Sequence, residues 1–404
     1  MHKLVRRLTN ASPIRKGLTG VLLLLIVAGV SGCHTLGFYG QAIKGQYEIF
    51  SSEQKIEKLL QDTAATEELR QRLQLVQQLR IFAKTDLKLP IDNHYLKYAD
   101  LHRPFVVWNV EAAPEFSMQP KTWWYPFLGS LEYRGYFSKR GATNYANYLK
   151  RKGLDASVGG VEAYSTLGWF KDPVLNTFIF EPDADLAEII FHELGHQRVF
   201  ARGDTDFNEA FATTVGQEGA RRWLKSCRGA SSLEGYQSHL RRNDQFVHLV
   251  MKIRARLEAL YGDIRDEEGK IQATRKNKNV PSEQLRREKN EILKEMKEEY
   301  ARLKRSWDGD TEYDGWFVRE VNNAHLNSVA AYYDLVPAFE HLLAMNGSDL
   351  ERFYDAADRL SKGSDKERRA TLKALAYERK VAANAGSPLE SSGPEADAKP
   401  KVED

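Results

Sequence analysis

The sequence has only two cysteines among its 404 residues, Cys33 and Cys227. Two thiols allow at most one disulfide, so the chain is not one of the small secreted domains that several disulfides stabilise. It also lacks an apolar run of the roughly 20 residues that a membrane-spanning helix needs, because the run at residues 21–30 is about half that length. With 42% hydrophobic and 28% charged residues, the chain is expected to be a globular protein with a packed core.

The sequence has little excess charge of either sign. Its 59 Lys and Arg residues oppose 56 Asp and Glu residues, a formal charge of +3. Five of the basic residues lie before residue 17, in a segment with the features of a removable leader, and without them the balance is 54 to 56, or −2. A near-neutral chain without a zinc-finger, helix-turn-helix or RNA-binding motif has no electrostatic basis for binding nucleic acid. We therefore exclude nucleic acid as a partner.

The first 32 residues have the order of a bacterial export signal. Basic residues precede the apolar run, and the small residues Ser31 and Gly32 lead to Cys33. Residues 30–33 match all four positions of the box at which bacterial lipoproteins are cleaved and acylated. We expect a lipid on Cys33 to anchor the mature chain to the membrane, the alternative being ordinary cleavage beside an incidental cysteine. His34, in place of Asp, indicates the outer membrane of the cell envelope, facing the periplasm.

Patterns along the chain predict a helix-rich α+β fold. Helices are indicated where apolar residues recur at spacings of three and four, and strands where short β-branched and aromatic runs are separated by Gly and Pro. Helices are expected at residues 39–83, 185–201 and 207–225, and strands of a small sheet at 105–110, 133–137 and 177–180.

Residues 246–306 are highly charged and contain two amphipathic helical patterns. They indicate a helical hairpin that projects from the body as a solvated arm, a lid or a docking site for a protein partner. The polar tail lacks the apolar residues needed to fold. The expected parts are an export signal (1–32), an N-terminal helical region (33–103), a catalytic core (104–245), the charged hairpin (246–306), a C-terminal helical part (307–385) and a disordered tail (386–404).

The strongest chemical signal is a pair of histidines, His192 and His196, in one of the predicted helices. At about 3.6 residues per turn, their imidazoles stand one above the other and can reach one zinc ion. Glu193 is rotated by about 100° from His192, so it can take a proton from water without being a ligand. This division of roles is typical of zincin metallopeptidases. The alternative is that the two histidines bind no metal and are either hydrogen-bonded in the core or exposed to solvent on a surface helix.

A catalytic zinc site generally has three protein ligands. Val199 and Arg202 stand where a metzincin has Gly and His, so that class is excluded. Glu209 begins a second predicted helix after a tight turn, and we expect it to be the third ligand, as in Glu-zincins, with Asn208 in a supporting role. The alternative is that Glu209 only caps a helix, because Asp206 and Glu209 have the spacing of a capping box.

Longer motifs extend the similarity beyond the zinc motif. They lie at residues 39–42, 45–46, 108–110, 114–116, 133–137, 163–170, 192–196, 206–212, 322–324 and 336–339. In these motifs the chain resembles the family of putative bacterial zinc aminopeptidases, whose members are often predicted lipoproteins. The resemblance covers most of the mature chain and implies a zincin-like core with zinc as cofactor and peptides as substrates.

Two other functions fit the same sequence. One is an endopeptidase or amidase that acts on envelope material. The other is a non-catalytic lipoprotein in which zinc is structural and the hairpin recruits a partner. Glu193 counts against the second, because a structural site needs no base beside its ligands.

Glu-zincins generally have, in addition, a Tyr or His that donates a hydrogen bond to the oxyanion that develops in the transition state. Tyr332 is the first candidate for this catalytic role, followed by Tyr164 and His325, although each can instead be a packed aromatic residue or a surface histidine. Carboxylates that could bind a free α-amino group are Glu115, Glu162 and Glu181.

Overall fold

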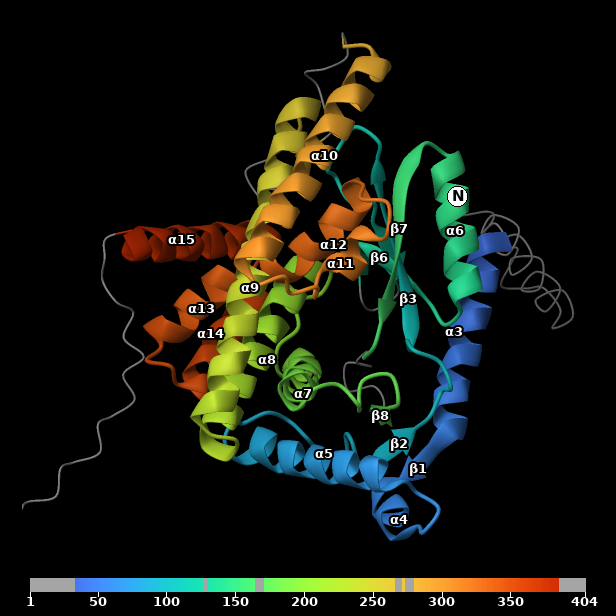
Figure 1. The fold of residues 1–404 in the computed structure, drawn as a ribbon, viewed down its shortest axis with the longest axis vertical. Coiled ribbons are helices and arrows are strands. Elements are labelled where there is room, and N and C mark those ends of the chain that lie inside the picture. Colours follow the sequence, from blue (N-terminus) through green and yellow to red (C-terminus); the bar gives the residue numbers. More distant parts are fainter. Residues whose placement is uncertain (1–32, 126–128, 164–170, 266–270, 273–279, 385–404) are drawn as a thin grey trace, which may run out of the picture.

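A computed structural model describes residues 33–125, 129–163, 171–265, 271–272 and 280–384, and it has the expected helix-rich α+β fold (Figure 1). The expected signal at 1–32 and tail at 386–404 lie outside these residues. No helix in the described ranges is long and apolar enough to cross a membrane. In chain order the first elements are α3 (Cys33–Ser52), β1 (Glu53–Lys55), α4 (Ile56–Gln61), α5 (Glu67–Thr85), β2 (Lys97–Ala99), β3 (Val107–Pro114), β4 (Trp123–Tyr125), β5 (Gly129–Leu131), β6 (Tyr133–Tyr136), α6 (Lys139–Arg151), β7 (Leu154–Val161) and β8 (Val174–Leu175).

The second half of the chain is mainly helical (Figure 1). Its elements are α7 (Asp183–Arg198), α8 (Thr205–Cys227), α9 (Ala230–Tyr261), β9 (Ile264–Arg265), β10 (Ile271–Gln272), α10 (Ser282–Ser306), α11 (Asp314–Phe317), α12 (Asn323–Tyr333), α13 (Val336–Met345), α14 (Leu350–Lys362) and α15 (Asp365–Asn384).

The central sheet has three antiparallel strands in the order β6-β3-β7. On one face of β3, Trp108 and Val110 pack with residues of α6 in a buried cluster. Asn109 and Glu111 point to the opposite face, because successive side chains of a strand alternate. Glu111 lies in register with Tyr133 of β6. The strand therefore separates an apolar layer on the α6 side from a face that carries polar groups.

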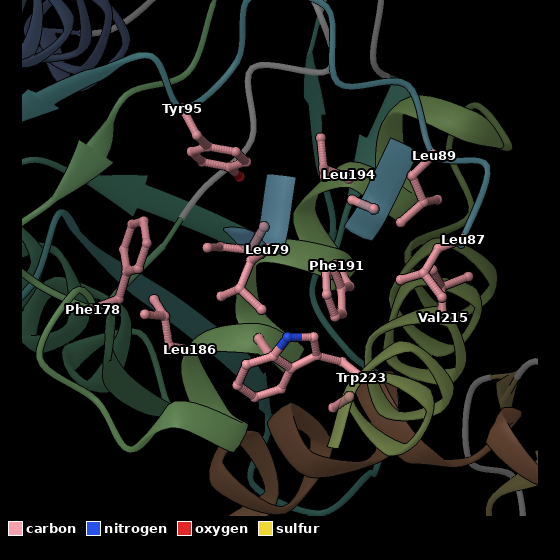
Figure 2. Close-up of a cluster of buried hydrophobic side chains, with 14 of the residues drawn as sticks. Leu79, Leu87, Leu89, Tyr95, Phe178, Leu186, Phe191, Leu194, Val215 and Trp223 are labelled. Carbon is pink, nitrogen blue, oxygen red and sulfur yellow. The ribbon is translucent and has the colours of Figure 1, made fainter. Parts of the chain in front are cut away.

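The helix with the histidine motif, α7, lies in the largest apolar core. Leu186, Phe191 and Leu194 of α7 are fully buried there. Figure 2 shows them next to Leu79 of α5 and Trp223 of α8. Each large side chain of this kind contributes roughly 1.5–3 kcal/mol when buried, so α7 is held firmly on several sides.

Glycines allow α7 and α8 to approach each other closely. A Cβ atom at Gly216 of α8 would lie 2.8 Å from the carbonyl oxygen of Glu188 in α7. A Cβ atom at Gly195 of α7 would lie 3.4 Å from the Cα atom of Ala212. A larger residue at position 216 would push the helices apart. The close approach brings the beginning of α8 to the histidines of α7.

Some elements differ from the expectations drawn from the sequence. Residues 177–180 form turns instead of a strand, and Phe178 and Ile179 are buried in the core. A short apolar run does not by itself distinguish a strand from other buried segments. The helix α6 was not expected, although Ser138 provides a typical N-cap that accepts a hydrogen bond from the backbone N–H of Gly141. The N-terminal region, expected to be helical, also contains β1 and β2.

The charged hairpin exists as α9 and α10, but it is fastened to the body along its length. The helix α9 begins at Ala230, before the expected start at 246, and contacts both α8 and α12. The first turns of α10 form ion pairs with the sheet region, Arg286 with Glu115 and Lys289 with Asp155, each at 2.6 Å. The hairpin therefore helps to position α12, which carries Tyr332.

Candidate metal centre

The two histidines of the motif lie in the last two turns of α7, one turn apart. Their Nε2 atoms are 3.2 Å apart, and the ring planes are nearly perpendicular, at 86°. His196 is almost completely buried and His192 is mostly buried, with 9% and 16% of their side chains exposed. Two Nε2 atoms at this distance point to a shared partner.

Glu209 of α8 faces the same point. Its Oε2 atom lies 3.4 Å from Nε2 of His192 and 3.5 Å from Nε2 of His196. The cap of α8 is a different residue, Asp204, whose side chain accepts a hydrogen bond from the backbone N–H of Phe207. The capping-box alternative for Glu209 is therefore wrong, because with Asp204 as the N-cap the N3 position is Phe207, and Glu209 lies beyond it.

The three atoms have the spacing that a zinc ion requires. With zinc at about 2.0–2.1 Å from each ligand and tetrahedral angles, two ligand atoms are about 3.3–3.4 Å apart. The observed separations are 3.2, 3.4 and 3.5 Å. Two imidazole nitrogens and one carboxylate oxygen are also ligands that zinc commonly takes in enzymes. The residues present therefore fit a zinc ion.

The charges of the three residues suit a cation. Burial raises the pKa of Glu209, but the two histidines outweigh it and lower that pKa to about 2. Burial lowers the pKa of His192, which favours the neutral imidazole that binds metals. Burial also acts to lower the pKa of His196, but the carboxylate of Glu209 reverses the shift and raises it. The two histidines thus stabilise the ionised form of the Glu209 carboxylate.

Glu193 lies beside the three residues with a free carboxylate oxygen. It is 8% exposed, and its Oε2 atom has no hydrogen-bond partner among the described residues. Burial raises its pKa to about 8, and Glu209 and Asp172 add to that effect, whereas His196 opposes it. A buried carboxylate without a structural partner is costly, so such a group is a candidate for a chemical role.

The four residues open into a cavity of about 380 Å³ between the sheet, α3, α7, α8 and α12. Tyr332 of α12 lines this cavity, and its ring stacks against that of His192 with centroids 6.3 Å apart. The negative charge of Glu209, together with burial, raises the pKa of Tyr332. Its hydroxyl therefore stays protonated and can donate a hydrogen bond inside the cavity.

Tyr133 of β6 lines the same cavity, and it was not selected from the sequence, where it is only part of a family motif. Burial raises its pKa, as does Glu209. It lies opposite Glu111 of β3, on the face of the sheet that borders the cavity. Other lining residues are Phe38, Tyr39, Ala42, Val107, Asn109, Tyr125, Leu131, Gly135, Phe137, Val161, Ala163, Phe200, Thr205 and Asn208.

Several other candidates lie elsewhere. His325 stacks on Trp316, with ring centroids 4.1 Å apart, and is not part of the cavity lining. Burial lowers its pKa to about 4, so it is a packed neutral histidine. Tyr164 lies outside the described residues.

The three carboxylates proposed as amine anchors do not line the cavity either. Glu115 is paired with Arg286 at 2.6 Å. Burial raises the pKa of Glu162 to about 7, and Glu181 and Asp185 add to the effect, which places Glu162 in a separate acidic group.

Asn208 supports the centre by closing the turn between α7 and α8. Its Oδ1 atom accepts a hydrogen bond from the backbone N–H of Ala201 at 2.7 Å. Its Nδ2 atom donates a hydrogen bond to the carbonyl oxygen of Ala201 at 2.8 Å. Both residues are buried. The turn therefore fixes where α8 begins, and hence where Glu209 lies relative to α7.

Replacing Asn208 with alanine is expected to lower the free energy of unfolding by about 1–3 kcal/mol for each backbone group of Ala201 left without a partner. Urea unfolding of the metal-free protein measures this loss. Thr214→Ala in the same helix is a matched control, because the hydroxyl of Thr214 bonds only within α8. An Asn208→Ala protein as stable as wild type would show that the turn does not depend on this side chain.

Comparisons with known proteins place this chain in a family. A search of curated proteins and a search of solved structures each gave no significant match. A family model described as Putative aminopeptidase matches residues 37–372, well over half of the chain, and this span contains the histidines, both glutamates and Tyr332. The chain therefore belongs to the family of putative aminopeptidases.

Proposed function

We propose that this protein is a zinc-dependent aminopeptidase in which His192, His196 and Glu209 hold the metal and Glu193 is the general base. One observation carries the proposal. Three ligand atoms lie 3.2–3.5 Å apart, and the carboxylate beside them has an Oε2 atom without a hydrogen-bond partner among the described residues. Membership of an aminopeptidase family supports the same conclusion.

The residues have complementary tasks in peptide hydrolysis. A bound zinc ion supplies a Lewis acid that polarises a peptide carbonyl and makes water easier to deprotonate near neutral pH. Glu193 accepts the proton of the attacking water and gives it to the leaving amine as the C–N bond breaks. The hydroxyl of Tyr332 donates a hydrogen bond to the carbonyl oxygen that gains negative charge in the transition state. The surrounding apolar walls exclude competing water from these groups.

Hydrolysis assays on short peptides with free and blocked N-termini test this function. The purified protein should release N-terminal residues, lose the activity with a chelator and regain it with zinc. Cleavage of blocked peptides at internal bonds would favour an endopeptidase, and release of amide-linked envelope groups would favour an amidase. Zinc binding without hydrolysis of any substrate would favour a scaffold whose hairpin recruits a protein partner.

We also propose that a lipid on Cys33 holds the enzyme at the outer membrane of the cell envelope, facing the periplasm. The first described helix, α3, starts at Cys33. Farther along α3, Ile43 and Tyr47 are 71% and 69% exposed, and their spacing of four places them on one face of the helix. Exposed apolar side chains on a helix that begins at an acylated residue would add to membrane affinity.

Replacing Cys33 with serine is expected to leave an unprocessed or soluble protein, because serine cannot form the thioether to the lipid. Membrane fractionation of cells that produce each form measures the distribution. Cys227→Ser, which changes the other cysteine, should fractionate like wild type. Membrane association of the Cys33→Ser protein at wild-type levels would rule out this anchor.

A further inference from the structure

The cavity that contains the candidate zinc ligands is lined by two kinds of side chain. Its charged groups come from α7 and α8, which supply His192, Glu193, His196 and Glu209. None of the other lining residues that the structure describes has a charged side chain. Those that come from α3, the strands and the segments that follow the strands are mostly apolar or aromatic: Phe38, Tyr39, Ala42, Val107, Tyr125, Leu131, Gly135, Phe137, Val161 and Ala163. A ligand at the zinc site therefore meets an apolar wall on its other side.

The helix α3 is fastened to the end of β6 by Gln41. Its Oε1 atom accepts a hydrogen bond from the backbone N–H of Phe137 at 2.8 Å, and its Nε2 atom donates to the carbonyl oxygen of Gly135 at 3.4 Å. One turn farther along α3, Gly45 lies against the ring of Phe137, because a Cβ atom there would be 2.0 Å from the ring Cγ atom. Ala42 directly follows Gln41 and lines the cavity. The part of the wall that α3 contributes therefore has a fixed position.

The ring of Phe38 is a second fixed part of this wall. It is 8% exposed, and the guanidinium carbon of Arg134 lies 4.1 Å from its centroid. The rings of Tyr136 and Tyr125 lie 5.6 and 6.0 Å away, the first of them edge to face. Aromatic and cation–π contacts at such distances favour one orientation of a ring. The shape of the wall is therefore set before a ligand binds, which lowers the entropic cost of binding.

Small and branched side chains leave space next to the zinc ligands. Val107 of β3 lies in register with Val161 of β7. A Cβ atom at Gly135 would lie 3.0 Å from a methyl group of Val107, so the strands are closely packed at this point. The cavity of about 380 Å³ falls in the range of roughly 300–1,000 Å³ that encloses small organic ligands. It therefore has room for a large side chain in addition to a peptide group at the zinc ligands.

We propose that the apolar pocket formed by Phe38, Ala42, Val107, Phe137 and Val161 binds a bulky apolar side chain of the residue whose carbonyl is attacked, and that Ala42 limits its size. The inference rests on the proposed peptidase function and gives it a side-chain preference. A charged side chain would lose its hydration in this pocket without gaining a partner. A small side chain would leave the walls without contacts. Leucine and phenylalanine are therefore preferred to glycine, alanine, lysine and glutamate.

A set of substrates tests the pocket through activity. The p-nitroanilides of leucine, phenylalanine, alanine, lysine and glutamate have the same amino group and leaving group and differ only in the side chain. The kcat/KM of wild type should be roughly 100-fold higher for leucine and phenylalanine than for alanine, because each missing methylene costs about 10- to 200-fold in an apolar pocket. The lysine and glutamate substrates should be cleaved at least as slowly as the alanine substrate.

Substitutions at position 42 should change the preference and not only the rate. Ala42→Phe should lower kcat/KM for the phenylalanine substrate by roughly tenfold or more and that for the alanine substrate by less than about threefold. Ala42→Asp should raise the lysine substrate relative to leucine by roughly tenfold, because a carboxylate would then pair with the ammonium group. Ile43 is 71% exposed and does not line the cavity. Ile43→Phe and Ile43→Asp are therefore matched controls that should keep the wild-type order of substrates.

A binding measurement separates the pocket from catalysis. Calorimetry on the zinc-loaded Glu193→Gln protein would compare phenylalaninamide with glycinamide, which have the same amino and amide groups. Phenylalaninamide should bind roughly 100-fold more tightly, and adding Ala42→Phe should reduce the difference to less than about tenfold. Thermal melting checks that each variant is folded. Ala42→Val adds less volume and should shift both measurements in the same direction, so the test remains available if Ala42→Phe is unstable.

The outcomes separate the pocket from the proposed function. If wild type hydrolyses none of the substrates, the proposed function is wrong, and the two amides still decide about the pocket: tighter binding of phenylalaninamide supports it, and equal binding overturns it. If wild type prefers the alanine, lysine or glutamate substrate to leucine, the pocket is wrong even though peptides are hydrolysed. The same conclusion follows if folded Ala42→Phe and Ala42→Val proteins keep the wild-type order of substrates and amides.

Discussion

Replacing Glu193 with glutamine is expected to reduce kcat for peptide hydrolysis by about 100- to 10,000-fold, while zinc content stays at the wild-type level. Glutamine has nearly the same size and can still form hydrogen bonds, but it cannot accept a proton from water. The proposed ligand atoms belong to His192, His196 and Glu209, so the substitution removes none of them. Steady-state kinetics and metal analysis on the same preparations measure the two quantities.

A matched control lies on the same helix. Glu188 is a glutamate of α7 that does not line the cavity and whose carboxylate is bonded to Tyr236. Glu188→Gln should keep both zinc and activity. If Glu193→Gln protein is as active as wild type, Glu193 is not the base. If it loses zinc together with activity, Glu193 supports the metal site instead of acting on the substrate.

Replacing Glu209 with alanine is expected to weaken zinc binding by more than the 10- to 100-fold that loss of an outer-shell partner typically costs. The substitution removes one of three protein ligands and leaves two histidines that hold metal poorly by themselves. Activity should fall with zinc occupancy and should recover in part at high zinc concentration. Equilibrium dialysis against zinc gives the affinity, and kinetics at graded zinc concentrations give the activity.

The neighbouring residue Asp206 supplies the control for this change. It lies one turn before Glu209 on α8, and its carboxylate is paired with Arg369 at 3.3 Å, away from the histidines. Asp206→Ala should affect stability more than zinc affinity. Full zinc occupancy of the Glu209→Ala protein at wild-type affinity would remove Glu209 from the ligand set.

Local patterns predicted the parts of the site that depend on one helix. The i, i+4 spacing of His192 and His196 is fixed by helical geometry, so their alignment followed from the sequence. The position of Glu209 was harder to predict, because Asp206 and Glu209 also fit a capping box. Asp204 caps α8 through Phe207, which excludes the capping box, and the ligand role of Glu209 stays a prediction.

The sequence did not predict the parts that depend on packing between distant segments. Glu111 and Tyr133 meet because β3 and β6 pair in one register, and a shift of one residue would point Glu111 to the opposite face. The amine anchors suggested from the sequence, such as Glu115, were carboxylates near family motifs. Glu115 lies at the end of the same strand region, but Arg286 of the hairpin neutralises it. A single sequence cannot show which carboxylate is paired in this way.

The same limit applies to the secondary structure. The apolar run at 177–180 resembled a strand, yet it provides buried side chains from turns next to α7. The helices of the hairpin were predicted from their periodicity, but their attachment to the body was not. Lys289 reaches Asp155 across more than a hundred residues of sequence, and both are largely buried.

We propose that His192, His196 and Glu209 bind one zinc ion on which peptide hydrolysis depends. Titration of the metal-free protein with zinc, with peptide hydrolysis followed at each step, tests it most directly. Activity is expected to rise linearly from the background level and to saturate at one zinc ion per chain, and His196→Ala should show no such rise over the same range. Full activity in the metal-free protein, or saturation with zinc without any hydrolysis, would contradict it.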